Sequence, residues 1–271
     1  MDLKRLADLR RADAVTMITL AGTGHIGGAM SCLDILTCLY YQVMRIDPKQ
    51  PGMPDRDRLI LSKGHSVEGL YAILADLGFF DKKELRTFAQ EGSRLISHPH
   101  NKVPGVEMCT GSLGHGLSIG VGMALAAKRT GTDYKTFVIL GDGELAEGSI
   151  WEAAMAGAAY KLDNLYAIID RNRLQISGCT EDVMPLEDLR AKWEAFGWDV
   201  SELDGHNMEA LVSYFNTSRQ NKAPHCLIAH TVKGKGILFA EDRAEWHHQV
   251  PTQEQLQEAY AALGVKGVDW I

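Results

Sequence analysis

The sequence predicts a doubly wound α/β fold, in which helices flank a mainly parallel sheet. Short apolar segments alternate with longer segments of helical periodicity between residues 58 and 230. The apolar segment 136–140 leads into a Gly-rich turn, an Ala-rich helix and a second apolar segment at 165–169, which is the pattern of a strand–helix–strand unit. Because no Pro-, Gly- or Ser-rich linker divides the chain, we expect residues 1–271 to form a single domain.

The individual elements follow in order along the chain. Two helices come first, separated by the Gly-rich turn that carries His25, and a loop at 48–57 leads to the first strand. The segment 92–107 has no regular pattern, and long loops within compact domains are usually functional. The segment 233–248 is expected to be a loop that returns to the edge of the sheet where the motifs gather. The expected helices are 2–21, 29–44, 69–77, 114–128, 149–161, 208–221 and 252–262. The expected strands are 58–61, 136–140, 165–169, 198–203 and 225–230.

The most informative motif follows the strand at 136–140. It reads Gly-Asp-Gly and contains Asp142, and Asn172 follows the next strand. Since the carboxyl ends of parallel strands meet at one edge of a sheet, we expect both side chains there. A carboxylate and an amide oxygen suit Mg²⁺ or Ca²⁺, and the helix N-terminus that follows favours phosphate. The motif predicts a metal-bridged diphosphate, although Asp-Gly also occurs in ordinary turns.

Composition narrows the possible functions. The chain has 271 residues, of which 45% are hydrophobic and 23% charged, as in ordinary globular proteins. A net charge of −7 argues against a nucleic-acid partner and against attachment to an anionic membrane. The first residues form a charged amphipathic pattern without the apolar core of a signal peptide. The five cysteines lack CxxC spacing and predict reduced thiols in the cytoplasm.

Further motifs accompany the Gly-Asp-Gly run, and their order is specific. They are Gly-His-Ile-Gly-Gly at 24–28, Ser-Lys-Gly-His at 62–65, His-Pro at 98–99, Pro-Gly-Val-Glu at 104–107, Gly-Ser-Leu-Gly-His-Gly at 111–116 and Trp-His-His at 246–248. In this order the motifs resemble the amino-terminal domain of transketolase. The resemblance implies a thiamine diphosphate cofactor and transfer of a two-carbon ketol group from a ketose to an aldose through a covalent adduct on thiamine.

The resemblance also gives roles to four histidines. It implies that His65 and His247 contact the cofactor diphosphate and substrate hydroxyls. It places His25 at the substrate carbonyl and hydroxyl region, and His98 at the first hydroxymethyl group of the donor ketose. Histidine suits these roles because it titrates near neutrality and both donates and accepts hydrogen bonds. His248 leaves a one-residue ambiguity in the match, in which we favour His247.

The remaining roles concern the cofactor and its metal. The resemblance implies that Asp142, the side-chain oxygen of Asn172 and the backbone oxygen of Leu174 bind the metal. The residues implied to line the cofactor are Leu113, Gly114 and Gly143. Glu147 resembles a glutamate that connects cofactor sites across a dimer interface; a first-turn charge favoured by the helix dipole explains it equally well.

Three departures from full-length transketolases stand at Ile26, His100 and His115. The residues Ile26 and Gly28 resemble the stand-alone, split members of the family, and the two histidines add titratable groups near the expected substrate funnel. The cofactor assignment is unaffected by these differences, but the identity of the sugar stays open.

In full-length enzymes a second domain binds the aminopyrimidine ring and the sugar phosphate, and this chain ends at Ile271 without it. We therefore expect an obligate partner, a carboxy-terminal transketolase subunit, in an α2β2 heterotetramer. The alternatives are a specialised enzyme for a branched or sulfonated ketose, a thiamine-dependent synthase that condenses pyruvate with a sugar aldehyde, and a non-catalytic thiamine diphosphate-binding module.

Overall fold

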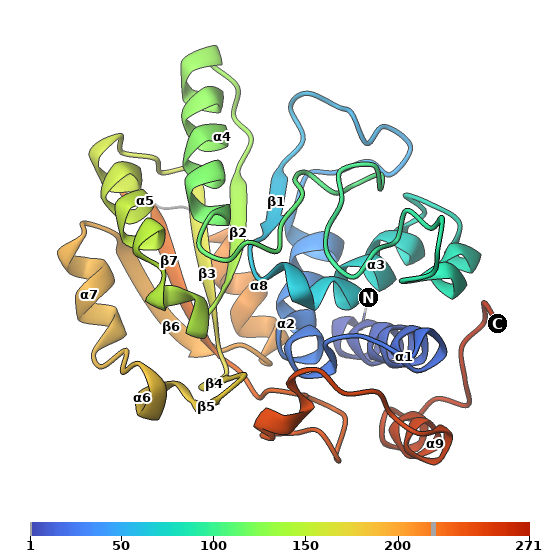
Figure 1. Ribbon diagram of the computed structural model, residues 1–271. Helices are drawn as coiled ribbons and strands as arrows, with labels where there is room; N and C mark the ends of the chain where they lie inside the picture. Colours follow the sequence, from blue (N-terminus) through green and yellow to red (C-terminus); the bar gives the residue numbers. More distant parts are fainter. Residues whose placement is uncertain (1, 218–220) are drawn as a thin grey trace.

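The computed structural model describes residues 2–217 and 221–271, and it places one sheet between two layers of helices (Figure 1). The strands are β1 (Arg58–Leu61), β2 (Thr136–Gly141), β3 (Leu165–Arg171), β4 (Leu174–Gln175), β5 (Gly178–Cys179), β6 (Asp199–Asp204) and β7 (His225–His230). The helices are α1 (Leu3–Ala21), α2 (Ile26–Cys38), α3 (Val67–Leu77), α4 (Gly116–Thr130), α5 (Gly148–Ala159), α6 (Thr180–Val183), α7 (Leu189–Ala195), α8 (Met208–Asn216) and α9 (Gln253–Ala262).

The main sheet has five parallel strands in the order β1-β2-β3-β7-β6. All seven residues of β3 are buried, as expected for a central parallel strand covered on both faces. Gly141 at the end of β2 pairs with Asp170 near the end of β3. This register places Asp142 and Asn172 just beyond the same edge of the sheet, as the sequence predicts.

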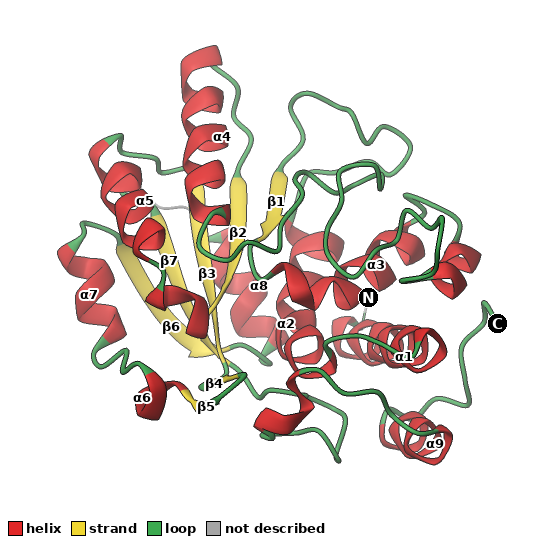
Figure 2. Cartoon of the chain, in the orientation of Figure 1, coloured by secondary structure: helices red, strands yellow, loops and turns green. Residues whose placement is uncertain are grey.

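Side chains alternate between the two faces of the sheet and form two cores. Phe137 and Ile139 of β2 pack with α2, α3 and α8, whereas Val138 and Leu140 pack with α4, α5 and α7. Figure 2 shows these helices as separate layers on the two sides of the sheet. The doubly wound, mainly parallel α/β fold predicted from the sequence is therefore confirmed.

A third apolar cluster joins α1 and α9 to the outer side of α2. Val15 and Ile18 of α1 pack with Ile26 and Met30 of α2, and Leu256 and Tyr260 close the cluster from α9. The chain end packs instead with the core that contains Phe137, where Trp270 is buried and its indole donates a 2.6 Å hydrogen bond to Asp13 of α1. Among the described residues, no helix is long and apolar enough to cross a membrane.

Several predicted boundaries were wrong. The second helix begins at Ile26, not at residue 29, and a π-helical turn (Leu39–Val43) follows its α-helical part. The helix expected from residue 114 begins at Gly116, because Gly114 has a φ of 84° that no α-helix contains. The helix expected to end at residue 221 ends at Asn216, and residues 218–220 lie outside the described part of the chain.

Short elements were missed altogether. The helix α7 begins after Asp188, whose carboxylate accepts a 2.9 Å hydrogen bond from the Ala191 N–H, so the cap was readable although the helix is short. The two-residue strands β4 and β5 form an antiparallel hairpin that is too short to show a period. The segment 233–248, expected to be a loop, contains a 3₁₀ turn at Ala244–His247.

Candidate functional site

The predicted site residues gather at a cavity of about 310 Å³ beyond the carboxyl ends of β1, β2 and β3. Those that line it are His25, His65, His98, Leu113, Asp142, Gly143, Asn172, Leu174 and His247. A second cavity, of about 480 Å³, lies between α5 and α7, but its lining is mainly apolar and contains none of the motifs. These predicted residues therefore meet at one place, although they come from seven separate segments.

One half of this cleft consists of oxygen atoms at the ends of β2 and β3. Asp142 is buried, and its Oδ1 accepts a 2.8 Å hydrogen bond from the Gly143 N–H. Its Oδ2 accepts from the Arg173 N–H at 2.5 Å and from Arg171 at 3.2 Å. Burial, followed by the charge of Asp170, raises the pKa of Asp142 above its usual range. The carboxylate is thus fixed in orientation by the chain itself.

Asn172 and Leu174 complete this oxygen half. The Leu174 N–H donates to Asn172 Oδ1 at 3.1 Å, and the Leu174 carbonyl accepts from Lys233 Nζ at 3.1 Å. A carboxylate, an amide oxygen and a carbonyl oxygen are hard ligands of the kind that Mg²⁺ and Ca²⁺ take. Within 2–217 and 221–271 no group of three or more His, Cys, Asp and Glu side chains could hold a metal ion. A cation here would therefore need the amide and carbonyl oxygens as ligands in addition to the carboxylate. The three oxygen atoms present fit such a cation.

The other half of the cleft consists of histidine rings. The ring centroid of His25 lies 5.3 Å from that of His65, 6.1 Å from that of His98 and 5.6 Å from that of His247. The ring centroids of His65 and His247 are 5.0 Å apart. The rings come from four separate segments of the chain, so the fold alone brings them together.

These histidines are neutral at physiological pH. Burial, together with neighbouring histidines and Lys233, lowers the pKa of His25 to about 4. Burial and the charge of Lys233 lower the pKa of His247 to about 3. The pKa of His65 is lowered well below its ordinary value, first by burial and then by Lys63, and burial lowers the pKa of His98. Neutral imidazoles both donate and accept hydrogen bonds, as contacts to sugar hydroxyls require.

The histidine half retains unused hydrogen-bonding capacity. His25 Nδ1 is buried and has no hydrogen-bond partner. An orphaned buried polar atom at a cleft is costly unless a ligand satisfies it. A Cβ atom on Gly28 would lie 2.6 Å from Ser66 Oγ, and one on Gly111 would lie 2.8 Å from His98 Cδ2. A side chain at position 111 would therefore displace the His98 ring, and one at position 28 would displace Ser66 beside His65.

Four charged residues of the site had no role in the sequence interpretation. Lys63 and Lys233 line the cavity, and both are buried. Lys63 pairs with the buried carboxylate of Asp170. The charge of this carboxylate raises the pKa of Lys63, although burial acts to lower it. Glu144 accepts hydrogen bonds from Ser62 and from the Gly114 and Gly141 N–H groups, and so joins three segments of the cleft. Lys63 stands inside the Ser-Lys-Gly-His motif and Glu144 directly follows the Gly-Asp-Gly motif, and these positions were the signal that could have found them.

Some predicted residues lie outside the cavity lining. Gly114 and Glu147 are behind it, where a Cβ on Gly114 would lie 2.6 Å from Glu147 Cβ. His115 is exposed, and its ring Nδ1 lies 3.0 Å from the Leu113 carbonyl oxygen. His248 lies beside His25, at a centroid distance of 4.5 Å, and His100 accepts from the Lys102 N–H at 3.1 Å. None of these five belongs to the wall of the cavity.

This fold and site define an α/β domain with a polar ligand site at the carboxyl edge of its sheet, the position at which such folds bind nucleotides and phosphorylated cofactors. The family described as "Transketolase, thiamine diphosphate binding domain" matches residues 3–269. The chain belongs to this family and is part of a transketolase enzyme.

Two relatives and one solved structure place the chain more closely. It is 54% identical over 258 residues to a protein of Phocaeicola vulgatus named as a subunit of apulose-4-phosphate transketolase, covering 95% of this chain and 92% of that protein. It is 42% identical over 269 residues to the 6-deoxy-6-sulfo-D-fructose transketolase subunit SqwG of a Clostridium species, covering 98% of both. The transketolase structure from Campylobacter jejuni matches with a TM-score of 0.93 at 31% identity, covering 99% of this chain and 44% of that one. The chain therefore spans less than half of that transketolase.

Proposed function

We propose that this chain is the amino-terminal subunit of a two-chain transketolase and holds the diphosphate of thiamine diphosphate in the cleft. The observation that carries the proposal is the convergence of neutral histidines, two lysines and a trio of hard oxygen ligands on one cavity. When bound, the cofactor supplies the carbanion chemistry for transfer of a two-carbon ketol group from a ketose to an aldose. Residues 1–271 form its single diphosphate-binding domain.

The oxygen half would hold the metal that grips the diphosphate. Asp142, Asn172 Oδ1 and the Leu174 carbonyl would coordinate Mg²⁺ or Ca²⁺, with Leu113, Gly114 and Gly143 along the cofactor. The ammonium groups of Lys63 and Lys233 add positive charge to the same cavity, which favours a diphosphate. Glu147 would act behind the site, between copies of the assembly.

The histidine half would serve the sugar. His65 and His247 would contact diphosphate and substrate hydroxyls, while His25 and His98 would face the carbonyl end of the donor. His25 Nδ1 is the buried atom without a partner, so a substrate hydroxyl or carbonyl would satisfy it. The neutral rings can pass a proton to and from a hydroxyl without leaving a buried charge.

A carboxy-terminal transketolase subunit would complete the site, in a cytoplasmic α2β2 heterotetramer. The two relatives are each named as a transketolase subunit, and this chain covers almost the whole of both. The five cysteines are all free thiols, which fits a reducing compartment.

A second candidate is narrower: the enzyme acts on a branched ketose phosphate. The observation favouring it is the 54% identity to a protein named for apulose 4-phosphate, against 38% to the transketolase of Homo sapiens. The 42% identity to the sulfofructose enzyme keeps a sulfonated ketose in the same panel.

The test is a donor half-reaction with the assembled enzyme, thiamine diphosphate and Mg²⁺, in the absence of acceptor. A double displacement releases the shortened aldose before any acceptor is added. A panel of linear, branched and sulfonated ketoses then identifies the donor. Release only when both substrates are present would contradict the mechanism, release of carbon dioxide from pyruvate would favour a synthase, and cofactor binding without turnover would leave a non-catalytic module.

A further inference from the structure

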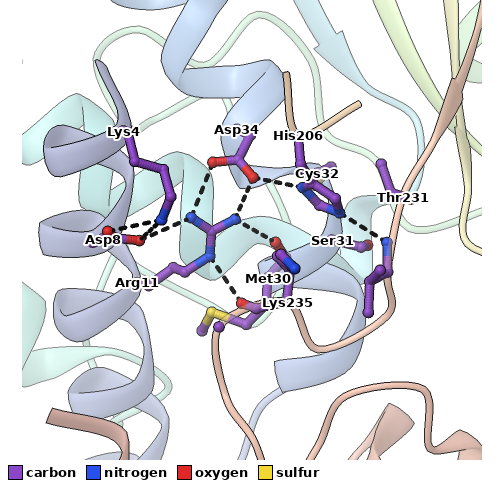
Figure 3. Close-up of polar contacts among 12 residues, drawn as sticks. Lys4, Asp8, Arg11, Met30, Ser31, Cys32, Asp34, His206, Thr231 and Lys235 are labelled. Carbon is purple, nitrogen blue, oxygen red and sulfur yellow. Dashed lines mark hydrogen bonds and ion pairs between the residues drawn. The ribbon is translucent and has the colours of Figure 1, made fainter. Parts of the chain in front are cut away.

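A buried polar network lies beside the cleft and outside its wall. Arg11 of α1 and Asp34 of α2 are 1% and 2% exposed. The guanidinium donates to both carboxylate oxygens, from Nη1 at 3.0 Å and from Nη2 at 2.6 Å (Figure 3). Burial alone would raise the pKa of Asp34, but Arg11 and a hydrogen bond from His206 hold it at about 2. The pair is thus a fixed, fully charged anchor between two helices.

His206 connects this anchor to another part of the chain. It follows β6, and its Nδ1 lies 2.6 Å from Asp34 Oδ2 (Figure 3). Its Nε2 lies 2.8 Å from the backbone nitrogen of Val232. Because a backbone N–H can only donate, Nε2 must carry the lone pair. The ring proton therefore stands on Nδ1 and points at Asp34, which fixes His206 as one neutral tautomer.

The same network grips the segment 231–235 at two points. His206 accepts from Val232, and Arg11 Nε donates to the Lys235 carbonyl at 2.9 Å. Between these points Lys233 is buried and extends into the cleft. Its Nζ lies 3.1 Å from the Leu174 carbonyl and 3.1 Å from His247 Nδ1. Lys233 is the group through which the segment contacts both halves of the cleft.

We propose that His206, oriented by the Arg11–Asp34 pair, is a positioning residue that holds Val232 and thereby places Lys233 between the oxygen half and the histidine half of the cleft. The consequence for the cofactor rests on the function proposed above, whereas the consequence for the segment does not. Loss of the hydrogen bond frees the Val232 N–H and one side of Asp34 Oδ2. The segment then keeps its Arg11 contact, the hydrogen bonds of Thr231 to the end of β3 and that of the Gly234 N–H to the Gly27 carbonyl. Between these contacts Val232 is no longer held, and Lys233 samples positions away from Leu174.

The two nitrogens of His206 can be tested separately. His206→Asn places an amide near the Nδ1 position, so it retains a donor to Asp34 and loses Val232. His206→Gln places an amide oxygen near the Nε2 position, so it retains an acceptor for Val232. The matched control is His230→Ala, because His230 is a half-exposed histidine at the end of β7 that contacts Glu202 at 2.8 Å and takes no part in the network.

The first readout is hydrogen–deuterium exchange of the Val232 amide in the full chain without cofactor. Loss of one well-made hydrogen bond corresponds to about tenfold faster exchange. We expect this increase in His206→Asn, near-wild-type exchange in His206→Gln, and no change in His230→Ala. Equal exchange in the Asn and Gln variants overturns the proposal, because an acceptor at the Nε2 position then does not restrain the Val232 amide.

The second readout is the affinity of the assembled enzyme for thiamine diphosphate with Mg²⁺, by calorimetry. We expect about tenfold weaker binding for His206→Asn, with partial rescue in His206→Gln. If the wild type binds no cofactor, the proposed function fails while the exchange result still stands. If the wild type binds and His206→Asn binds equally well, the positioning role fails.

A third readout needs no variant. Long-range proton–nitrogen spectra of the full chain report the tautomer of a neutral histidine. We expect His206 with its proton on Nδ1; a proton on Nε2 contradicts the hydrogen bond from Val232 and overturns the proposal even if the variants do not fold.

Discussion

The two halves of the cleft are built in opposite ways. In the oxygen half, Asp142, Asn172 and Leu174 already accept hydrogen bonds from the chain, so their positions are set before any ligand arrives. In the histidine half, the half-buried rings of His65, His98 and His247 have centroids 5.3–6.1 Å from that of His25, whose Nδ1 has no partner. The contrast fits our proposal that the first half is a rigid site for a metal-bound diphosphate and that the second leaves polar atoms free for a sugar.

The largest effect is expected in the oxygen half. Asp142→Ala removes the only carboxylate among the proposed metal ligands, so metal-dependent binding of thiamine diphosphate should weaken at least about 1000-fold. Calorimetry with Mg²⁺ measures it, and Asp133→Ala, which removes an exposed carboxylate paired with Arg45, is the control. Unchanged affinity in Asp142→Ala would remove the metal assignment.

A buried carboxyl group behind the histidine half should lower the free energy of unfolding at neutral pH. Glu68 is fully buried behind His25, accepts the His25 N–H at 2.8 Å through Oε1, and leaves Oε2 without a partner. Burial raises its pKa from 4.5 to about 7, so the folded state binds more protons than the unfolded state between these values. Stability contributed by this group is therefore present below pH 4.5 and is lost as pH rises toward 7.

Glu68→Gln keeps the acceptor for His25 and removes the ionisation. Urea denaturation should show the variant more stable than the wild type by about 3 kcal/mol at pH 8, since one pKa unit corresponds to about 1.4 kcal/mol. The difference should shrink to near zero at pH 4.5. A difference that does not vary with pH would mean that Glu68 is not the titrating group.

The next prediction distinguishes a role in turnover of the sugar donor from a role in cofactor binding. His98→Ala should lower kcat/KM for the donor about 100-fold and change cofactor affinity by less than about twofold, because His98 belongs to the rings proposed to face the sugar and is not among the proposed metal ligands. His100→Ala is the matched control, two residues along the same loop and outside the cavity wall. Equal losses in donor turnover and cofactor binding would show that His98 has a structural role.

The smallest effect is expected at His115. This side chain is exposed and contacts the Leu113 carbonyl from outside the cleft. His115→Ala should therefore change cofactor affinity and donor kcat/KM by less than about twofold, within the range of ordinary surface substitutions. A change of donor preference in the ketose panel would instead bring His115 into the substrate funnel.

The two halves also differed in how far the sequence predicted them. The oxygen half followed from local pattern, because two adjacent parallel strands bring Asp142 and Asn172 to one edge whatever the rest of the chain does. The histidine half could be assembled only from resemblance, since His25, His65, His98 and His247 come from loops with no period to relate them. Leu174 lies in a hairpin too short to predict from a periodic pattern, so its role as a ligand came from the resemblance and stays a prediction.

The contacts that no pattern could give are the long-range polar ones. His206, Arg11 and Asp34 are far apart in the chain, and each alone resembles an ordinary turn or surface residue. Burial of Lys63 against Asp170 likewise depends on two strand ends meeting. Such pairs depend on how the helices pack on the sheet. Sequence periodicity predicts which face of a helix or strand is buried, but it does not predict which residues of two elements meet.

We propose above all that a single cleft contains both a binding site for the diphosphate and a cluster of histidines that contacts the sugar. The most direct test is a calorimetric titration of thiamine diphosphate into the chain assembled with the proposed carboxy-terminal partner, with Mg²⁺ and then with a chelator. We expect one cofactor to bind per copy of this chain, and binding to be lost when the metal is removed. Absence of binding with metal, or equal binding after its removal, would contradict it.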